Sequence, residues 1–115
     1  MEIFVKNRKL RLALEDEAMC KKQFGPEMAR KLMLRMGVLK AAISLADFWP
    51  ANTGTERCHE LTGDLAGKFS MDLKQPYRLL FVPGELLSKA DYLNEKERWS
   101  AIISVEILGI EDTHG

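Results

Sequence analysis

The hydrophobic and polar positions of residues 1–24 predict a strand followed by a helix. Residues 3–5 form a short β-prone run, which indicates an opening strand. From Asn7, a predicted N-cap, apolar residues then recur at helical spacing. The predicted helix ends before Phe24-Gly25-Pro26, and its apolar positions are Leu10, Leu14 and Ala18.

A longer helix is predicted after Pro26, because apolar residues recur there at steps of three or four. One apolar stripe consists of Met28, Leu32, Met36, Leu39, Ile43 and Ala46, and a second consists of Leu34, Val38, Ala41 and Leu45. A helix with two apolar sides is typical of packing between a sheet and another helix, and the alternative is an apolar side that receives a partner protein. Trp49-Pro50 is expected to end this helix.

Residues 68–82 alternate between apolar and polar positions, which is the pattern of strands. Phe69, Met71 and Leu73 point one way, while Lys68, Ser70 and Asp72 point the other. After a turn at residues 74–76, the same alternation sets Tyr77, Leu79 and Phe81 against Arg78, Leu80 and Val82. The two segments predict a hairpin with one polar face.

The last third of the chain predicts one more strand. Pro83-Gly84 ends the hairpin, and residues 85–99 are charged, with a helical turn expected at Leu86, Leu87, Ala90 and Leu93. Residues 101–110 are aliphatic and β-branched, so they predict a central strand with Asp112 and His114 just past its end.

A single domain covering residues 1–115 is expected, because a chain of this length with 46% apolar residues can bury a sizeable core. Cys20 and Cys58 have no spaced partners, so neither a disulfide framework nor a zinc site is indicated. The N-terminus is too short and too charged for a signal peptide, and no apolar run approaches the roughly 20 residues of a membrane span. We therefore expect a soluble cytoplasmic protein without a membrane partner.

The charges are balanced overall but unevenly placed. Lys and Arg together number 17, as do Asp and Glu. Residues 1–40 nevertheless hold ten basic residues against five acidic ones, a net charge of +5. Such a basic side can dock on phosphates, and the alternative is an ordinary solvated helical surface.

Two histidines and an arginine are the candidate residues for a chemical reaction. His59 and His114 each lie close to a carboxylate in the sequence, and histidine can take and give a proton near neutral pH. Arg78 lies on a predicted strand, where its guanidinium could grip a phosphate. These residues indicate phosphodiester chemistry. No cofactor is expected, and the histidines and acids lack the spacing of a metal site.

Five segments in order resemble one protein family. They are Phe24-Gly25, His59-Glu60-Leu61-Thr62-Gly63, Gly67-Lys68-Phe69-Ser70-Met71-Asp72, Pro76-Tyr77-Arg78-Leu79-Leu80-Phe81 and Asp112-Thr113-His114. With helices first, then a hairpin and a last strand, the chain resembles the RelE/ParE superfamily of bacterial toxin-antitoxin toxins. Within it, the chain is most similar to the HigB-like, host-killing (plasmid maintenance killer) group.

The resemblance implies an α+β fold of N-terminal helices packed on a small, mainly antiparallel β-sheet. It also implies a metal-independent endoribonuclease, an mRNA interferase that cleaves mRNA at the ribosome and so inhibits translation. The implied partners are the ribosome, mRNA and a cognate HigA-like antitoxin, which would form a hetero-oligomer with the toxin in the bacterial cytoplasm.

The family's catalytic residues would fall on His59, Arg78, Asp112 and His114, with Lys68 and Thr113 contacting RNA. The histidines would serve as base and acid in an order left open, Arg78 would stabilise the charge on phosphorus, and Asp112 would orient an imidazole. Many members carry tyrosine where this chain has Thr113, which cannot stack on a base.

Purely structural roles stay open for the same residues. His59 could be hydrogen-bonded to the backbone, His114 lies next to the terminus, and Arg78 could simply pair with Asp72 across the hairpin. At the level of function, the alternatives are a non-enzymatic ParE-like toxin that poisons DNA gyrase, and a degenerate toxin that acts only through antitoxin binding.

Overall fold

The computed structural model describes residues 1–112, which form helices and a mixed β-sheet. The α-helices are α1 (Arg8–Glu15), α2 (Glu17–Phe24), α3 (Pro26–Ala41) and α4 (Glu95–Ser100). The strands are β1 (Glu2–Val5), β2 (His59–Glu60), β3 (Phe69–Asp72), β4 (Tyr77–Pro83) and β5 (Ser104–Asp112). Short 3-10 turns lie at η1 (Leu45–Phe48), η2 (Gly63–Leu65) and η3 (Lys89–Asp91).

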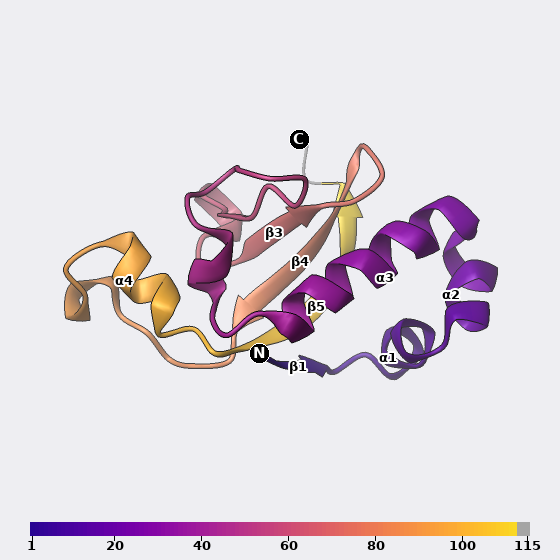
Figure 1. Ribbon diagram of the computed structural model, residues 1–115, viewed down its shortest axis with the longest axis horizontal. Coiled ribbons are helices and arrows are strands. Elements are labelled where there is room, and N and C mark those ends of the chain that lie inside the picture. Colours follow the sequence, from indigo (N-terminus) through magenta and orange to yellow (C-terminus); the bar gives the residue numbers. More distant parts are fainter. Residues whose placement is uncertain (113–115) are drawn as a thin grey trace.

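The strands join in the order β1-β5-β4-β3-β2. Only β1 and β5 run parallel within the described sheet, and the other three neighbouring pairs are antiparallel. Helices α1, α2 and α3 gather on one side of the sheet, while α4 lies at the opposite end of the molecule from α2 (Figure 1). The predicted α+β fold, with N-terminal helices on a mainly antiparallel sheet, is therefore confirmed.

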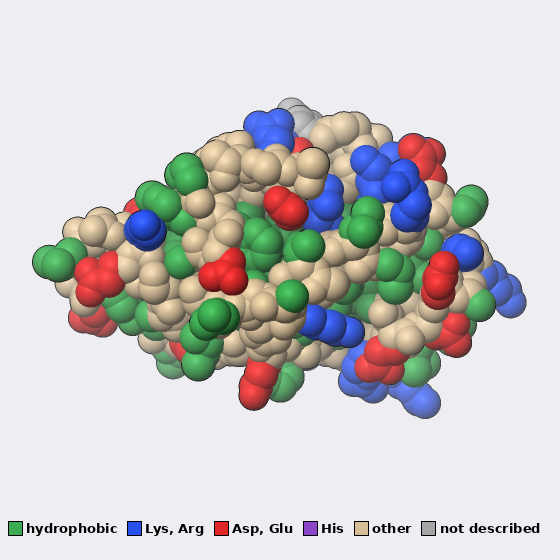
Figure 2. Space-filling view, viewed as in Figure 1, with side chains coloured by type: hydrophobic (Ala, Val, Ile, Leu, Met, Phe, Trp, Pro, Cys, Tyr) green, Lys and Arg blue, Asp and Glu red, His purple; other side chains and the backbone are tan. Residues whose placement is uncertain are grey.

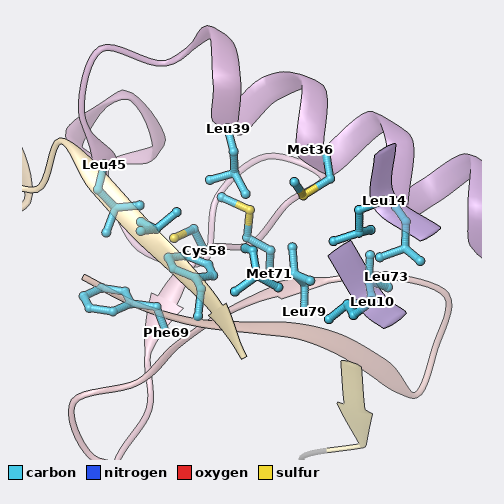
Figure 3. Packing of buried hydrophobic residues seen from close by; sticks show 14 of the residues in the cluster. Leu10, Leu14, Met36, Leu39, Leu45, Cys58, Phe69, Met71, Leu73 and Leu79 are labelled. Atoms are coloured by element: carbon cyan, nitrogen blue, oxygen red, sulfur yellow. The ribbon is translucent and has the colours of Figure 1, made fainter. Parts of the chain in front are cut away.

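The core lies between α3 and the sheet. Leu39 and Met36 of α3 point toward Met71 and Leu79 of the hairpin, and Leu14 of α1 closes one end of this layer (Figure 3). All five side chains are buried, as the helical stripe and the strand alternation predicted. The same alternation places Ser70, Asp72 and Arg78 on the other face of the sheet.

The first predicted helix is two helices, so that prediction is wrong. Asn7 caps α1 as expected, with its Oδ1 accepting the Leu10 N–H at 2.9 Å. Asp16 then leaves helical geometry, at φ −133°, and its carboxylate accepts the backbone N–H groups of Ala18 and Met19. An aspartate in this position starts a new helix, because its side chain satisfies N–H groups that lack helical partners.

The long helix is shorter than predicted, since α3 ends at Ala41. Ile43, expected on the buried stripe, is 83% exposed, and Leu45 of the expected second stripe lies in η1 with no exposed surface. The Ser44 hydroxyl accepts the Ala46 N–H, and the Asp47 carboxylate accepts the Ile43 N–H. These side-chain bonds hold a tighter turn after α3.

The segment between β4 and β5 also departs from prediction. The expected helical turn forms only around Ala90, in η3, while Leu86 and Leu93 lie outside it and are exposed. An α-helix that was not predicted, α4, follows. Trp99 of α4 is buried, with its ring 5.1 Å from Trp49 and 5.5 Å from Phe69 in edge-to-face contact. Strand β5 continues through Asp112, which was expected just past the end of the strand.

Cys20 and Cys58 are free thiols, and both are buried. Across residues 1–112, none of the helices has the length and apolar character needed to cross a membrane. Within the same residues, His, Cys, Asp and Glu side chains do not form any group of three able to hold a metal ion.

Candidate functional site

The sheet face away from the helices carries two of the predicted site residues. His59 of β2 lies opposite Ser70 of β3, while Asp72 of β3 lies opposite Arg78 of β4. Side chains of residues two apart on a strand share a face, so His59 and Arg78 point to the same side. From typical strand spacing and rise, their Cα atoms lie roughly 12 Å apart.

Arg78 forms the cross-strand pair that was one of the open alternatives. Its Nε lies 3.4 Å from Oδ1 of Asp72, and the two side chains are 14% and 9% exposed. At 3.4 Å this contact is an ion pair rather than a hydrogen bond, and the planar guanidinium of an arginine suits recognition of phosphate oxygens. Structural pairing and phosphate contact are therefore compatible at this position.

Asp72 has a second basic neighbour, Arg57, which sequence reasoning missed. The Nη1 of Arg57 lies 3.8 Å from Oδ2 of Asp72, and the Arg57 side chain is 54% exposed. Gln75 donates from Nε2 to the same oxygen at 3.4 Å. The available signal was a basic residue two positions before His59, but only the folded hairpin shows that Arg57 reaches Asp72.

Arg35 fixes the strand and the loop that carry these groups. It is a buried arginine of α3, and its Nε donates to the backbone carbonyl of Asp72 at 2.7 Å. Its Nη2 donates to the carbonyl of Thr55 at 3.1 Å. Sequence reasoning missed Arg35 as well, although its position among the buried residues of α3 between Leu32 and Leu39 was a usable signal.

The ring of His59 is oriented by the backbone. Its Nδ1 lies 2.9 Å from the carbonyl oxygen of Arg57. Because a carbonyl can only accept, Nδ1 carries the hydrogen, and the neutral ring then has its lone pair on Nε2. This fits the alternative that His59 is bonded to backbone, and it also leaves the tautomer that a general base needs.

The residues next to His59 have other roles. Glu60 forms ion pairs with Arg98 and, at 3.5 Å, with Lys89. Because Glu60 lies opposite Phe69, its side chain is on the face away from His59, so it does not orient that ring. Burial raises the pKa of the Cys58 thiol to about 12, so this cysteine stays protonated and is no nucleophile at neutral pH.

The structure does not bring Asp112 onto the face of His59 and Arg78. Asp112 lies opposite Tyr77, one position beyond the Arg78–Glu111 pair, so alternation turns its side chain to the other side. Lys68 is half-buried directly before β3, with its carbonyl accepting the Leu61 N–H at 2.8 Å. Thr113 and His114 lie outside the described residues.

On the face drawn in Figure 2, the basic residues do not form a patch of one sign. Figure 2 shows blue Lys and Arg side chains over the helices on the right, with red Asp and Glu side chains among them. Two basic residues of the N-terminal segment are paired, Lys21 with Glu17 at 3.1 Å and Lys6 with Glu106 at 3.4 Å. The view favours the interpretation of a solvated helical surface.

Comparisons with known proteins relate the chain to a toxin fold. No protein-family model matches the sequence, and no curated protein matches it. The structure is similar to that of a YoeB/ParE toxin from Agrobacterium tumefaciens, with a TM-score of 0.56 at 12% identity, covering 99% of this chain and 100% of the other. The chain therefore has the fold of this class of toxin. The narrower likeness to the HigB group rests on the sequence motifs alone.

Proposed function

We propose that the protein is the toxin of a toxin-antitoxin pair and that it cleaves mRNA on the ribosome. The observation that supports this most directly is the shared sheet face of His59 and Arg78 in a toxin-like fold. A proton acceptor and a phosphate-binding cation on one face are the minimum for cleavage of RNA without a metal.

The reaction would use the 2′-hydroxyl of the RNA as the nucleophile. One histidine removes the hydroxyl proton, the 2′-oxygen attacks the adjacent phosphorus, and the 5′-oxygen leaves with a proton from the other histidine. A 2′,3′-cyclic phosphate and a 5′-hydroxyl result. With Nδ1 bonded to the Arg57 carbonyl, His59 suits the role of base through Nε2, which leaves His114 as the acid. Arg78 would stabilise the charge on the phosphorane.

The other predicted site residues take supporting roles in this proposal. Since Asp112 is on the face away from His59, the imidazole that it would orient is that of His114. Lys68 would contact an RNA phosphate beside β3. With Thr113 in place of an aromatic residue, base stacking worth about 1–3 kcal/mol is lost, so slow cleavage is expected unless another group substitutes.

A second candidate function is non-enzymatic binding, as for a ParE-like toxin that poisons DNA gyrase. The pairing of Arg78 with Asp72 favours it, because a paired arginine needs no catalytic role. A degenerate toxin that acts only through antitoxin binding is the third candidate. In either case the sheet face that carries His59 and Arg78 would be the same, but no proton transfer would occur there.

The proposed partners are the translating ribosome with its mRNA and a cognate HigA-like antitoxin, joined to the toxin as a hetero-oligomer in the bacterial cytoplasm. The outer stripe of α3 is the proposed antitoxin contact, through Leu34, which is 52% exposed, and the half-buried Val38. Leu45, expected in the same stripe, is excluded because it is fully buried.

Mapping of mRNA 5′ ends before and soon after induction of the chain in bacteria tests the proposal. We expect new cuts within translated codons from the wild type, and none from His59→Ala, Arg78→Ala or His114→Ala. Lys22→Ala, which removes an exposed charge from α2, serves as the control and should cut normally. Growth arrest with a DNA-damage response and no cuts would support the gyrase poison. No growth effect with intact antitoxin binding would support the degenerate form.

A further inference from the structure

The Asp72 carboxylate lies between two guanidinium groups and faces each with a different oxygen. Oδ1 is 3.4 Å from Nε of Arg78, and Oδ2 is 3.8 Å from Nη1 of Arg57. The two arginines come from separate segments, β4 and the loop before β2, so the fold itself brings them together. The Asp72 carboxylate therefore faces two positive charges.

We propose that Arg57 and Arg78 form a two-arginine subsite for a phosphodiester of single-stranded RNA, and that Asp72 limits its affinity by competing for both guanidiniums. An RNA phosphate offers the same pair of anionic oxygens that Asp72 now presents, so phosphate and carboxylate would seek the same donors. The identification of RNA rests on the proposed function, whereas the anion chemistry rests on these three side chains.

The two arginines would contribute differently. Arg78 is only 14% exposed and is held within the sheet, so it would give the phosphate a fixed position. Arg57 is 54% exposed, and its 3.8 Å contact with Asp72 is long, so it can turn toward a bound anion at little cost. Arg57 would act as the adjustable side of the subsite.

The backbone of Arg57 joins this subsite to the proposed base. Its φ of +47° is in the left-handed region, which is sparsely populated by residues other than glycine, and its carbonyl accepts the Nδ1–H of His59. Residue 57 therefore directs a cation toward Asp72 with its side chain and fixes the His59 ring with its main chain.

Substitutions at these positions distinguish a subsite from a purely structural ion-pair cluster. In a structural cluster, loss of the Asp72 charge only weakens the fold. In a competing cluster, Asp72→Asn removes the carboxylate charge that faces both guanidiniums and raises the affinity for an anion. Removal of Arg57 lowers that affinity in the second case alone.

Fluorescence anisotropy with a fluorescein-labelled single-stranded RNA, measured on the full chain at several salt concentrations, gives the test. We expect Arg57→Gln and Arg78→Gln each to weaken binding about tenfold and to lower the salt slope by about 1. Asp72→Asn should tighten binding several-fold. Arg8→Gln, which removes an exposed charge at the start of α1, should change affinity less than twofold.

Equal affinities for Arg57→Gln and Arg8→Gln would overturn the inference. So would unchanged or weaker binding by a folded Asp72→Asn variant. Circular dichroism checks folding, and Arg57→Gln keeps the test decisive if Asp72→Asn does not fold, because residue 57 is largely exposed. If these affinities change as expected while induced cells show no mRNA cuts, the subsite stands and the proposed nuclease fails. If induced cells show mRNA cuts but Arg57→Gln binds the RNA with the same affinity as Arg8→Gln, the subsite is refuted and the proposed nuclease stands.

Discussion

Arg35 on α3 donates through Nε to the main-chain carbonyl of Asp72 on β3 at 2.7 Å, which ties the helical layer to the strand that carries the candidate site. The same guanidinium donates to the Thr55 carbonyl, so the loop leading to His59 is held as well. One buried side chain from the core side thus sets the positions of groups on the opposite face.

Replacement of Arg35 by lysine should destabilise the protein. Lysine keeps the charge but cannot present two N–H groups in a planar fork, so at least one of the two carbonyls loses its donor. We expect the free energy of unfolding, measured with urea, to fall by about 2–3 kcal/mol. Arg30→Lys on the exposed side of the same helix is the control and should stay within about 0.5 kcal/mol. Similar losses in both variants would argue against the Arg35 bonds.

The pairing of Glu95 with Arg98 should make stability depend on acid pH. The hydrogen bond from Arg98, which is buried in α4, lowers the pKa of the Glu95 carboxyl from its usual 4.5. A carboxyl with a lowered pKa in the folded state stabilises that state above pH 4.5 and loses this contribution as the pH falls through the lowered value.

Melting temperatures between pH 6 and pH 3 check this dependence. Both the wild type and Glu95→Gln should lose stability in acid, because other carboxyls also titrate, but the decline should be shallower in the variant. Glu97→Gln, in the same helix and bonded to the Leu93 N–H, tests whether any acid in this segment has the same effect. Parallel curves for wild type and Glu95→Gln would contradict the expectation.

The buried thiols should be unreactive in the folded protein. Burial raises the pKa of both cysteines, that of Cys58 to about 12, and both side chains have no exposed surface. We expect no alkylation by iodoacetamide at pH 8 in native buffer and complete alkylation in urea, as read by mass spectrometry. Rapid labelling of Cys58 without denaturant would mean that the segment before β2 opens readily. A raised thiol pKa also predicts that stability falls as the pH rises above 9.

Replacement by alanine should change the stability of the protein differently at two glycines. A Cβ on Gly84 would lie 3.1 Å from Cβ of Ser104 and closer still to its hydroxyl, so Gly84→Ala should cost about 1–3 kcal/mol. A Cβ on Gly109 of β5 would meet nothing within 4 Å, so Gly109→Ala should be neutral or slightly stabilising. Thermal denaturation of the pair measures the contrast. A loss at Gly109 as large as at Gly84 would contradict this geometry.

Periodicity predicted those elements whose side chains face the core. The hairpin and most of the α3 stripe were found because burial selects apolar residues at fixed spacing, as at Leu32, Leu39 and Leu79. The break at Asp16 and the turn after Ala41 were missed because Asp16 and Asp47 accept backbone N–H groups there, and such bonds leave the apolar pattern unchanged. These side-chain bonds ended the helices at positions where the apolar spacing alone predicted that they continue.

The candidate site was predictable only in part. His59 and Arg78 were found from motifs, and the sheet register places them on one face. Arg35 and Arg57 were missed because their partner, Asp72, is distant in sequence from both, so the contacts exist only after the hairpin folds. Asp112 was expected just past the end of the last strand to orient an imidazole, but the strand continues to residue 112 and turns its side chain to the face away from His59.

The parallel pairing of β1 with β5 imposes an order on assembly. Strand β1 is made first, yet its partner residues begin at Ser104. While a nascent chain lacks those residues, β1 has nothing to pair with, and β4 presents an open edge where β5 will insert between the two. Contacts so distant in sequence close late and slowly. The sheet that carries Arg78 is therefore completed only after β5 has been made, so a chain that lacks β5 presents Arg78 on an unfinished sheet.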